Sequence, residues 1–140
     1  MTPLHKFLSS AAGSELIRKC WGDMPCFDGP CDVIHVSQML SDSTEQEILF
    51  TGIFLTNESG DANECKPSKM LIRFAGVVAW EYDYGAAIEN GIESAEIFRS
   101  PPAGFIAVDA HLFRVVCRQI SVLSCEHYPF SDFADEEVAT

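Results

Sequence analysis

The chain has few basic residues and no long hydrophobic run. Its 140 residues include nine Lys and Arg against 21 Asp and Glu, so the formal net charge is −12. Nucleic acids and anionic membranes are poor partners for such a chain, because binding them requires a surplus of positive side chains. No apolar stretch approaches the ~20 residues of a membrane-spanning helix. Residues 1–20 contain no convincing signal-peptide cleavage site, so we expect a cytoplasmic protein. The acidity either serves solubility alone or attracts a basic protein partner.

The sequence motifs of common enzyme classes are also missing. There is no G-x-S-x-G, H-E-x-x-H, P-loop or G-x-G-x-x-G motif. Cys125 and His127 are two residues apart and would lie on one side of a strand, which leaves open a small hydrolase that uses Cys and His. A nucleophile–base pair also needs an orienting group and an oxyanion donor, and the sequence points to neither. The Asp residues of segment 21–32 lack the rhythm of a calcium loop. We therefore expect no catalytic residue, no metal site and no cofactor.

The six cysteines follow no disulfide or zinc pattern. Without a signal peptide, reduced cysteines are expected. Cys20, Cys26 and Cys31 are six and five residues apart, unlike the C-x₂-C spacing of zinc ligands. Cys117 and Cys125 lie in apolar, strand-like sequence, where a free Cys commonly acts as a small buried hydrophobic residue.

The composition predicts one folded domain over residues 1–140. A hydrophobic content of 47% in a chain of this length can form a sizeable core. Apolar residues at three- and four-residue spacings predict a helical N-terminal segment over 1–21, with a break after Gly13 and Ser14 as the cap of a second helical part. Residues 130–140 form an acidic tail of the kind that is usually solvated.

The clearest predicted strand covers residues 69–84. One parity of this segment carries the large apolar residues Met70, Ile72, Phe74, Val78, Trp80, Tyr82 and Tyr84. Alternation with a period of two and many aromatic or β-branched residues is the signature of a strand. Because ordinary strands have about five or six residues, we expect this one to bend or break at Gly76, where no Cβ is present.

Further segments complete an expected sheet of about six strands. Segment 21–32 is rich in Gly, Pro and Asp and predicts an irregular loop. The other predicted strands are 33–40, 47–56, 92–100, 105–109 and 112–123. Segment 47–56 is apolar on both parities and should be central. The fold class is therefore α+β and mostly antiparallel, with an N-terminal helix packed on a curved antiparallel sheet or a partly open barrel. An unpaired edge of this sheet would permit dimerisation.

Four short segments between residues 21 and 122 carry a family resemblance. The first, Trp21-Gly22-x-Met24-Pro25-x-Phe27-Asp28, resembles a W-G-x-x-P-S-F-H-D motif, and the second, Leu71-Ile72-Arg73-Phe74-Ala75-Gly76-Val77, resembles a leucine-x-phenylalanine-x-glycine-valine centre. The third, Asn90-Gly91-Ile92, resembles an Asn-x-Ile step. The fourth, 113–122, resembles a phenylalanine-rich strand ending in C-x-x-I-x-V. Together they resemble the bacterial immunity-protein family numbered fifty, whose members are associated with polymorphic toxin systems. One position departs from the pattern: the family carries His then Asp where this chain has Asp28 then Gly29.

The resemblance implies a protein that binds and neutralises a cognate toxin without catalytic groups of its own. We add the hypothesis that the acidic chain mimics phosphate in the basic, nucleic-acid-binding cleft of such a toxin. The residues expected to contact the toxin are Glu81, Tyr82, Asp83 and Tyr84 at the end of the long strand, with Asp28 and Asp32. Core burial is the commoner use of a stripe such as Trp80, Tyr82 and Tyr84. Two alternatives stay open: a β domain that binds a small ligand or serves as a structural subunit, and a small hydrolase.

Overall fold

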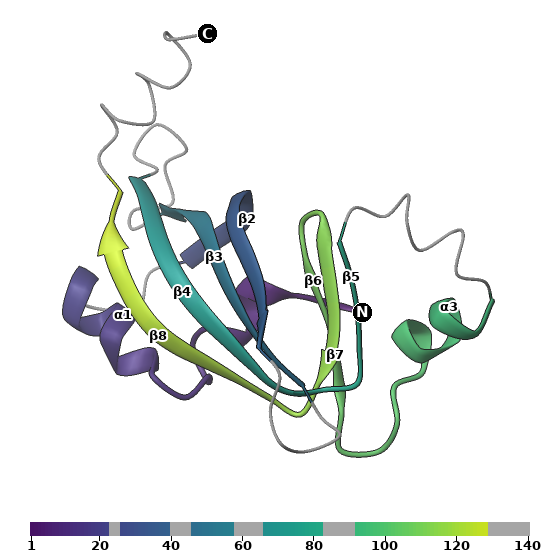
Figure 1. Cartoon of the computed structure of the whole chain (residues 1–140). Helices are drawn as coiled ribbons and strands as arrows, with labels where there is room; N and C mark the ends of the chain where they lie inside the picture. Colours follow the sequence, from purple (N-terminus) through teal and green to yellow (C-terminus); the bar gives the residue numbers. More distant parts are fainter. Residues whose placement is uncertain (23–25, 40–45, 58–65, 83–91, 129–140) are drawn as a thin grey trace, which may run out of the picture.

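The structure is a computed structural model in which two four-stranded sheets lie against each other (Figure 1). It describes residues 1–22, 26–39, 46–57, 66–82 and 92–128. One sheet has the order β1 (Thr2–Pro3), β6 (Ile106–Ala110), β7 (Phe113–Cys117) and β5 (Ala79–Tyr82), and the other has the order β2 (Cys26–Met39), β3 (Gln46–Asn57), β4 (Lys66–Val77) and β8 (Gln119–His127). All pairings between these strands are antiparallel except that of β1 with β6. The expected α+β, mostly antiparallel fold is therefore confirmed, and the sheets do not close into a barrel.

One bent ribbon joins the two sheets. A single residue, Val78, separates β4 from β5, and a single residue, Arg118, separates β7 from β8. Gly76 has a φ of 68°, and a Cβ added there would lie 2.8 Å from Cγ of Arg118. The backbone N–H of Arg118 donates to the carbonyl of Ala75 (3.0 Å), which ties the two corners together. The predicted break of segment 69–84 near Gly76 is confirmed, and it follows from the missing side chain at this position.

The main core lies between the two sheets. Three rings at its centre, Phe50, Phe74 and Phe113, have centroids 5.7 to 6.0 Å apart. Leu4 and Leu8 from the N-terminal segment are also fully buried in this cluster. Strand β3 is paired on both sides, with β2 and with β4, so the prediction that segment 47–56 is central is confirmed.

The N-terminal segment differs from the predicted helix over 1–21. Only α1 (Ser14–Trp21) is α-helical, and it is preceded by β1 and by a 3₁₀ turn, η1 (Leu4–Phe7). The reason is tertiary: Thr2 and Pro3 pair with β6, which commits their backbone to a sheet. The break at Gly13 is confirmed, because Gly13 precedes α1 with a φ of 84° and a Cβ there would overlap the carbonyl oxygen of Val122. Ser14 is the first helical residue rather than the cap.

Three other predicted segments are wrong. Segment 112–123 was predicted as one strand, but it divides at Arg118 into β7 and β8, which belong to different sheets. Segment 92–100 forms the helix α3 (Ile92–Arg99) and not a strand. Phe98 of this helix is 4% exposed and packs with Ala107 and Val116 on the outer face of β6 and β7. A strand in this place would not bury that face in the same way. Segment 21–32 is not all loop, because β2 begins at Cys26. A register shift between Asp28 and Asp32 absorbs the Gly and Pro residues of this segment.

No helix within the described ranges is long and apolar enough to cross a membrane.

Candidate functional site

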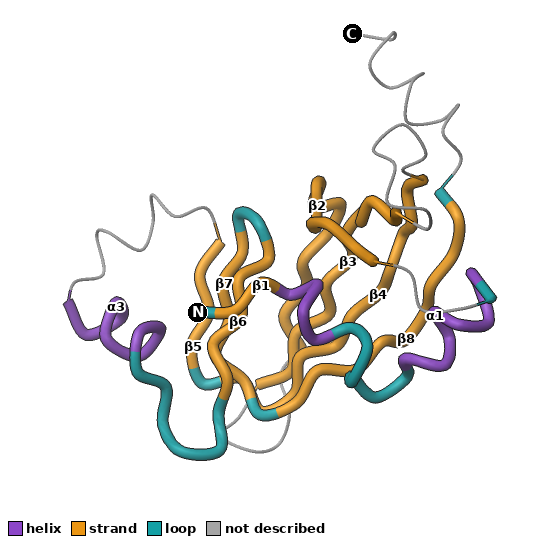
Figure 2. Tube along the Cα trace, turned by 180° about the vertical axis from the view of Figure 1, so that it is seen from behind, coloured by secondary structure: helices purple, strands orange, loops and turns teal. Residues whose placement is uncertain are grey.

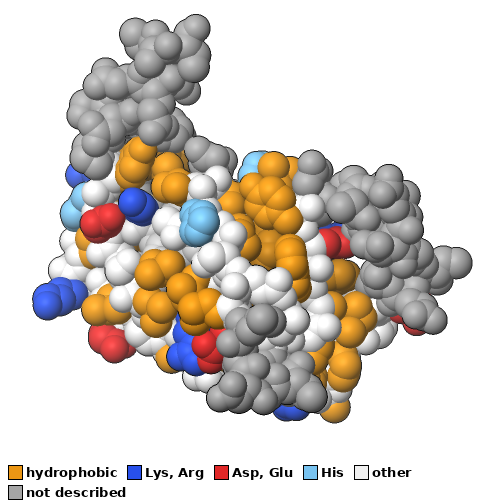
Figure 3. Space-filling model, viewed as in Figure 1, with side chains coloured by type: hydrophobic (Ala, Val, Ile, Leu, Met, Phe, Trp, Pro, Cys, Tyr) orange, Lys and Arg blue, Asp and Glu red, His pale blue; other side chains and the backbone are white. Residues whose placement is uncertain are grey.

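A hollow of about 460 Å³ lies between β2 and β5, which are edge strands of different sheets. The described residues that line it come from three strands, and none of them is acidic: Ile34, His35, Val36 and Gln38 of β2, Ile48 of β3, and Trp80 and Tyr82 of β5. Figure 3 shows apolar side chains gathered on this face of the molecule. The hollow is therefore an apolar surface between two sheet edges.

Strand β5 carries its two aromatic residues on the face that borders the space between the sheets, where both stay partly exposed. Trp80 is 40% exposed and Tyr82 is 42% exposed, whereas Glu81 between them is 7% exposed. Directly opposite residues of paired strands share a face, and Trp80 and Tyr82 lie opposite Val115 and Phe113, which are buried in the core between the sheets. The two aromatic side chains therefore face the space between the sheets, whereas Glu81 lies on the other face of β5, opposite Arg114 and on the side of α3. Exposure therefore changes along the predicted stripe: Met70, Ile72 and Phe74 are fully buried, and Trp80 and Tyr82 are partly exposed where the space between the sheets opens.

Glu81 forms an ion pair with Arg114, the residue directly opposite on β7. The Arg114 guanidinium also lies over the ring of Phe98, at 5.0 Å from its centroid. Burial lowers the pKa of the Arg114 guanidinium from its ordinary value. Glu81 was predicted to contact a partner, but the structure places it inside the fold, where it fixes the strand that carries Trp80 and Tyr82.

The structure describes only some of the other predicted contact residues. Tyr82 lines the hollow, and Asp83 and Tyr84 lie outside the described residues. Asp28 and Asp32 belong to β2, where their backbones pair with Leu55 and Ile53 of β3, and their side chains lie outside what the structure describes.

The β2 side of the hollow was missed by reasoning from the sequence. Ile34 and Val36 share one parity of segment 33–40, but Ile34 is 45% exposed whereas Val36 packs against the core. A register shift between Val33 and His35 changes which residues face the core. The only signal in the sequence was the apolar character of Ile34 and Val36, which does not reveal that β2 faces β5.

The outer edges of β8 and β5 differ in which described segments pair with them. At β8, Ala12 forms an isolated parallel bridge with Ser121, and the N–H of Val122 donates to the carbonyl of Ala12 (2.7 Å). Figure 2, seen from the other side than Figure 1, shows this N-terminal segment running in front of the sheets toward α1. At β5, no strand among the described ones pairs with the outer edge. The edge of β5 therefore borders the hollow with no described strand beside it.

The Cys125 and His127 pair does not form a catalytic arrangement. The His127 ring packs edge-on against Trp21 with centroids 4.1 Å apart, and its Nε2 lies 3.0 Å from the carbonyl oxygen of Cys20. Burial raises the pKa of the Cys125 thiol to about 12, which disfavours the reactive thiolate at neutral pH. Within the described part of the chain, no group of three or more His, Cys, Asp or Glu residues could hold a metal ion.

The net negative charge does not come from the described side chains. All nine Lys and Arg residues belong to them, but only six of the 21 Asp and Glu residues do, namely Glu15, Glu47, Glu81, Glu96, Asp109 and Glu126. The rest of the acidic residues belong to the parts of the chain whose side chains are not described. An acidic surface around the hollow therefore remains a prediction from the sequence.

Comparison of the chain with protein-family models, with curated proteins and with solved structures gave no match.

Proposed function

We propose that this protein is a non-enzymatic binding module that recognises a partner protein through the hollow between β2 and β5. The observation that carries the proposal is the exposure of Trp80 and Tyr82, at 40% and 42%, beside the apolar residue Ile34. Trp and Tyr dominate the residues that contribute most to protein–protein binding, because each offers a large rigid surface with one polar group. An exposed apolar patch on a folded protein commonly marks such a contact surface.

The outer edge of β5, with which no described strand pairs, supports the same proposal. An edge strand presents unpaired N–H and C=O groups that an extended segment of another protein can use. In this fold, Ala12 already closes the outer edge of β8 in a similar manner. A partner segment beside β5 would gain backbone hydrogen bonds from the strand and apolar contacts from Trp80 and Tyr82.

The proposed partner is the toxin of a polymorphic toxin system. The motif resemblance supports this choice, and the net charge of −12 favours a toxin with a basic surface. None of the described residues that line the hollow is acidic. We therefore assign two roles to different parts of the chain: the apolar hollow holds the partner, and the acidic residues elsewhere accelerate the encounter.

The test is co-purification with the product of the adjacent gene, followed by rescue of growth when that product is expressed. Trp80→Ala and Tyr82→Ala should each weaken binding by at least about tenfold, because hot-spot truncations cost more than ~1.4 kcal/mol. Leu123→Ala on β8 is the matched control, since Leu123 is equally exposed at 42% but lies outside the hollow. Added salt should reduce the association rate more than it raises the dissociation rate.

Two results would contradict this proposal. If the adjacent gene product does not bind, the toxin assignment fails. If it binds and the Trp80→Ala and Tyr82→Ala variants still rescue growth as the parent protein does, the hollow is not the contact surface.

A small ligand is the second candidate occupant of the hollow. Its volume of about 460 Å³ falls within the ~300–1,000 Å³ typical of small-molecule sites. Trp80 fluorescence would report such binding directly. A saturable change in that fluorescence on addition of small aromatic compounds, lost in Tyr82→Ala, would favour this candidate over a protein partner.

A further inference from the structure

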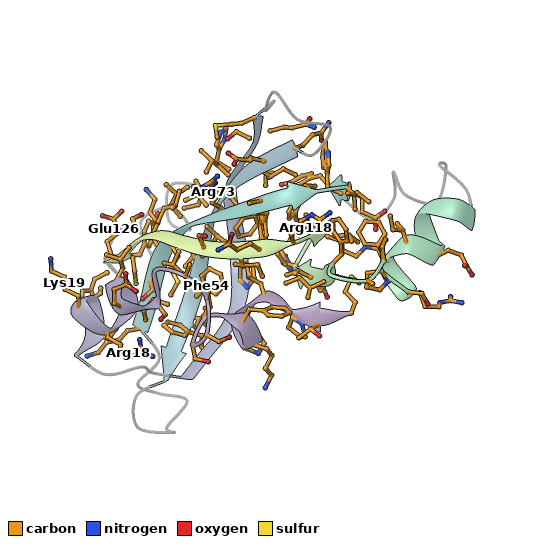
Figure 4. All side chains as sticks on the ribbon, turned by 90° about the horizontal axis from the view of Figure 1, so that it is seen from below. Arg18, Lys19, Phe54, Arg73, Arg118 and Glu126 are labelled. Atoms are coloured by element: carbon orange, nitrogen blue, oxygen red, sulfur yellow. The ribbon has the colours of Figure 1, made fainter. Side chains whose placement is uncertain are left out.

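A second hollow, of about 450 Å³, lies between α1 and β8 and contains two cysteines. Cys20 lies near the C-terminal end of α1, and Cys125 lies on β8. Both line the hollow, and both are half-buried free thiols. Figure 4 shows Lys19 and Glu126, the chain neighbours of these cysteines, at the same end of the molecule.

The two thiols face each other across the contact between α1 and β8. The Cys125 thiol lies within hydrogen-bonding reach of the side chain of Cys20. Two contacts hold the end of α1 in this place: Nε1 of Trp21 donates to Oγ of Ser68 (2.8 Å), and Nε2 of His127 lies 3.0 Å from the carbonyl oxygen of Cys20. These contacts, together with the hydrogen-bonding reach of Trp21 and Ser68 to the Cys125 thiol, keep the two sulfur atoms near each other.

We propose that Cys20 and Cys125 are a thiol modification site, which a low-molecular-weight disulfide such as oxidised glutathione converts to a disulfide that fastens α1 to β8. The Cys20 thiolate attacks one sulfur of the oxidant, whose S–S bond breaks and releases one thiol. Cys125 then attacks Sγ of Cys20 and releases the second thiol. The two protons of the cysteines go to the two released thiolates, so both cysteines are oxidised and the oxidant is reduced.

The order of these steps follows from the surroundings of the two sulfurs. Burial, with a smaller contribution from Cys20, raises the pKa of the Cys125 thiol to about 12, so this thiol is a poor first nucleophile for an oxidant in solution. Once Cys20 carries the oxidant, Cys125 is already in place and attacks within the same molecule. The third free cysteine among the described residues, Cys117, is fully buried in the core and is not accessible to an oxidant.

The disulfide would link positions far apart in the sequence, and the length of the closed loop determines the expected rise in Tm. A cross-link that closes a loop of about 100 residues removes much conformational freedom from the unfolded chain, which predicts a rise in Tm of roughly 10 °C. Among the residues that the structure describes, the hollow between β2 and β5 shares no lining residue with this site. Oxidation should therefore leave partner binding unchanged, and the inference stands independently of the proposed function.

The test uses the full chain with Cys26, Cys31 and Cys65 changed to Ser, beside the unchanged chain. Each is incubated with oxidised glutathione and examined by intact mass and by peptide mapping. We expect the loss of two hydrogens, a peptide pair linked through Cys20 and Cys125, and a higher Tm that returns to its starting value with reductant. In Cys125→Ser, the glutathione should remain on Cys20.

Three results would overturn the proposal: glutathione that stays on Cys20 when Cys125 is present, a disulfide that excludes either residue, or no reaction under native conditions. Should the triple variant fail to fold, peptide mapping of the unchanged chain decides among the same outcomes.

Discussion

Removal of either charge from the ion pair of Glu81 and Arg114 should destabilise the fold, and loss of Arg114 should have the larger effect. Glu81 has only 7% of its side chain exposed, whereas Arg114 retains 24%. Arg114→Met therefore leaves a carboxylate with almost no access to water. Glu81→Leu leaves a guanidinium that reaches solvent and still lies over the ring of Phe98.

The expected magnitudes follow from this difference in exposure. Breaking a buried ion pair by removing one partner costs about 3–5 kcal/mol, and we assign that range to Arg114→Met. For Glu81→Leu we expect about 2 kcal/mol, because the remaining cation is partly hydrated and its aliphatic stem stays packed. The double variant Glu81→Leu/Arg114→Met leaves no buried charge, so its free energy of unfolding should lie within about 1 kcal/mol of the parent value.

Urea unfolding of the four proteins measures these differences, provided that the m-values agree. The double variant is the deciding member of this cycle. If it is destabilised by the sum of the two single effects, the two side chains act independently and the reasoning is refuted. Partner binding should weaken in Arg114→Met and recover in the double variant, because the pair fixes the strand that presents Trp80 and Tyr82.

Three further substitutions test other contacts. Gly13→Ala should lower the free energy of unfolding in urea by more than about 2 kcal/mol, because a Cβ would overlap the carbonyl oxygen of Val122. Gly22 has a φ of 87° and a Cβ there would meet no atom within 4 Å. Gly22→Ala should therefore lower it only by the ~1–2 kcal/mol of the left-handed backbone. Equal effects would contradict this account. Trp21→Phe removes the hydrogen bond to Ser68, whose hydroxyl is fully buried. This change should lower the free energy of unfolding by about 1–3 kcal/mol. In a Ser68→Ala background, the same change should lower it clearly less. Phe113→Ala, in the centre of the core rings, should lower the free energy of unfolding by about 3–5 kcal/mol, and a loss below 1 kcal/mol would show that the core is not packed as described.

Local chemistry explains which parts of the fold could be predicted. Segment 47–56 was identified as a central strand because apolar residues on both of its faces require cover from both sides. The break near Gly76 was predictable because only a residue without Cβ allows a positive φ beside the Arg118 stem. Each of these properties depends on a few neighbouring residues.

The features that could not be predicted depend on contacts between residues far apart in the sequence. The eight residues of α3 fit a strand or a helix equally well by pattern, and the packing of Phe98 against Ala107 and Val116 settles the choice. Of the site, the exposed Trp80 and Tyr82 belonged to the predicted aromatic stripe. Their neighbours on β2 could not be found, because the register shift near Val33 and the meeting of two sheet edges are features of the tertiary fold.

The single-residue corners at Val78 and Arg118 have a mechanical consequence. Each sheet keeps its own pairing on either side of the corners, so a small change of the angle there would open or narrow the space in front of Trp80 and Tyr82 while every strand register stays the same. The width of the hollow between β2 and β5 is thus set by residues that are not among its described lining. Evolution could retune the fit to a new partner at Gly76 or Arg118 without altering one contact residue.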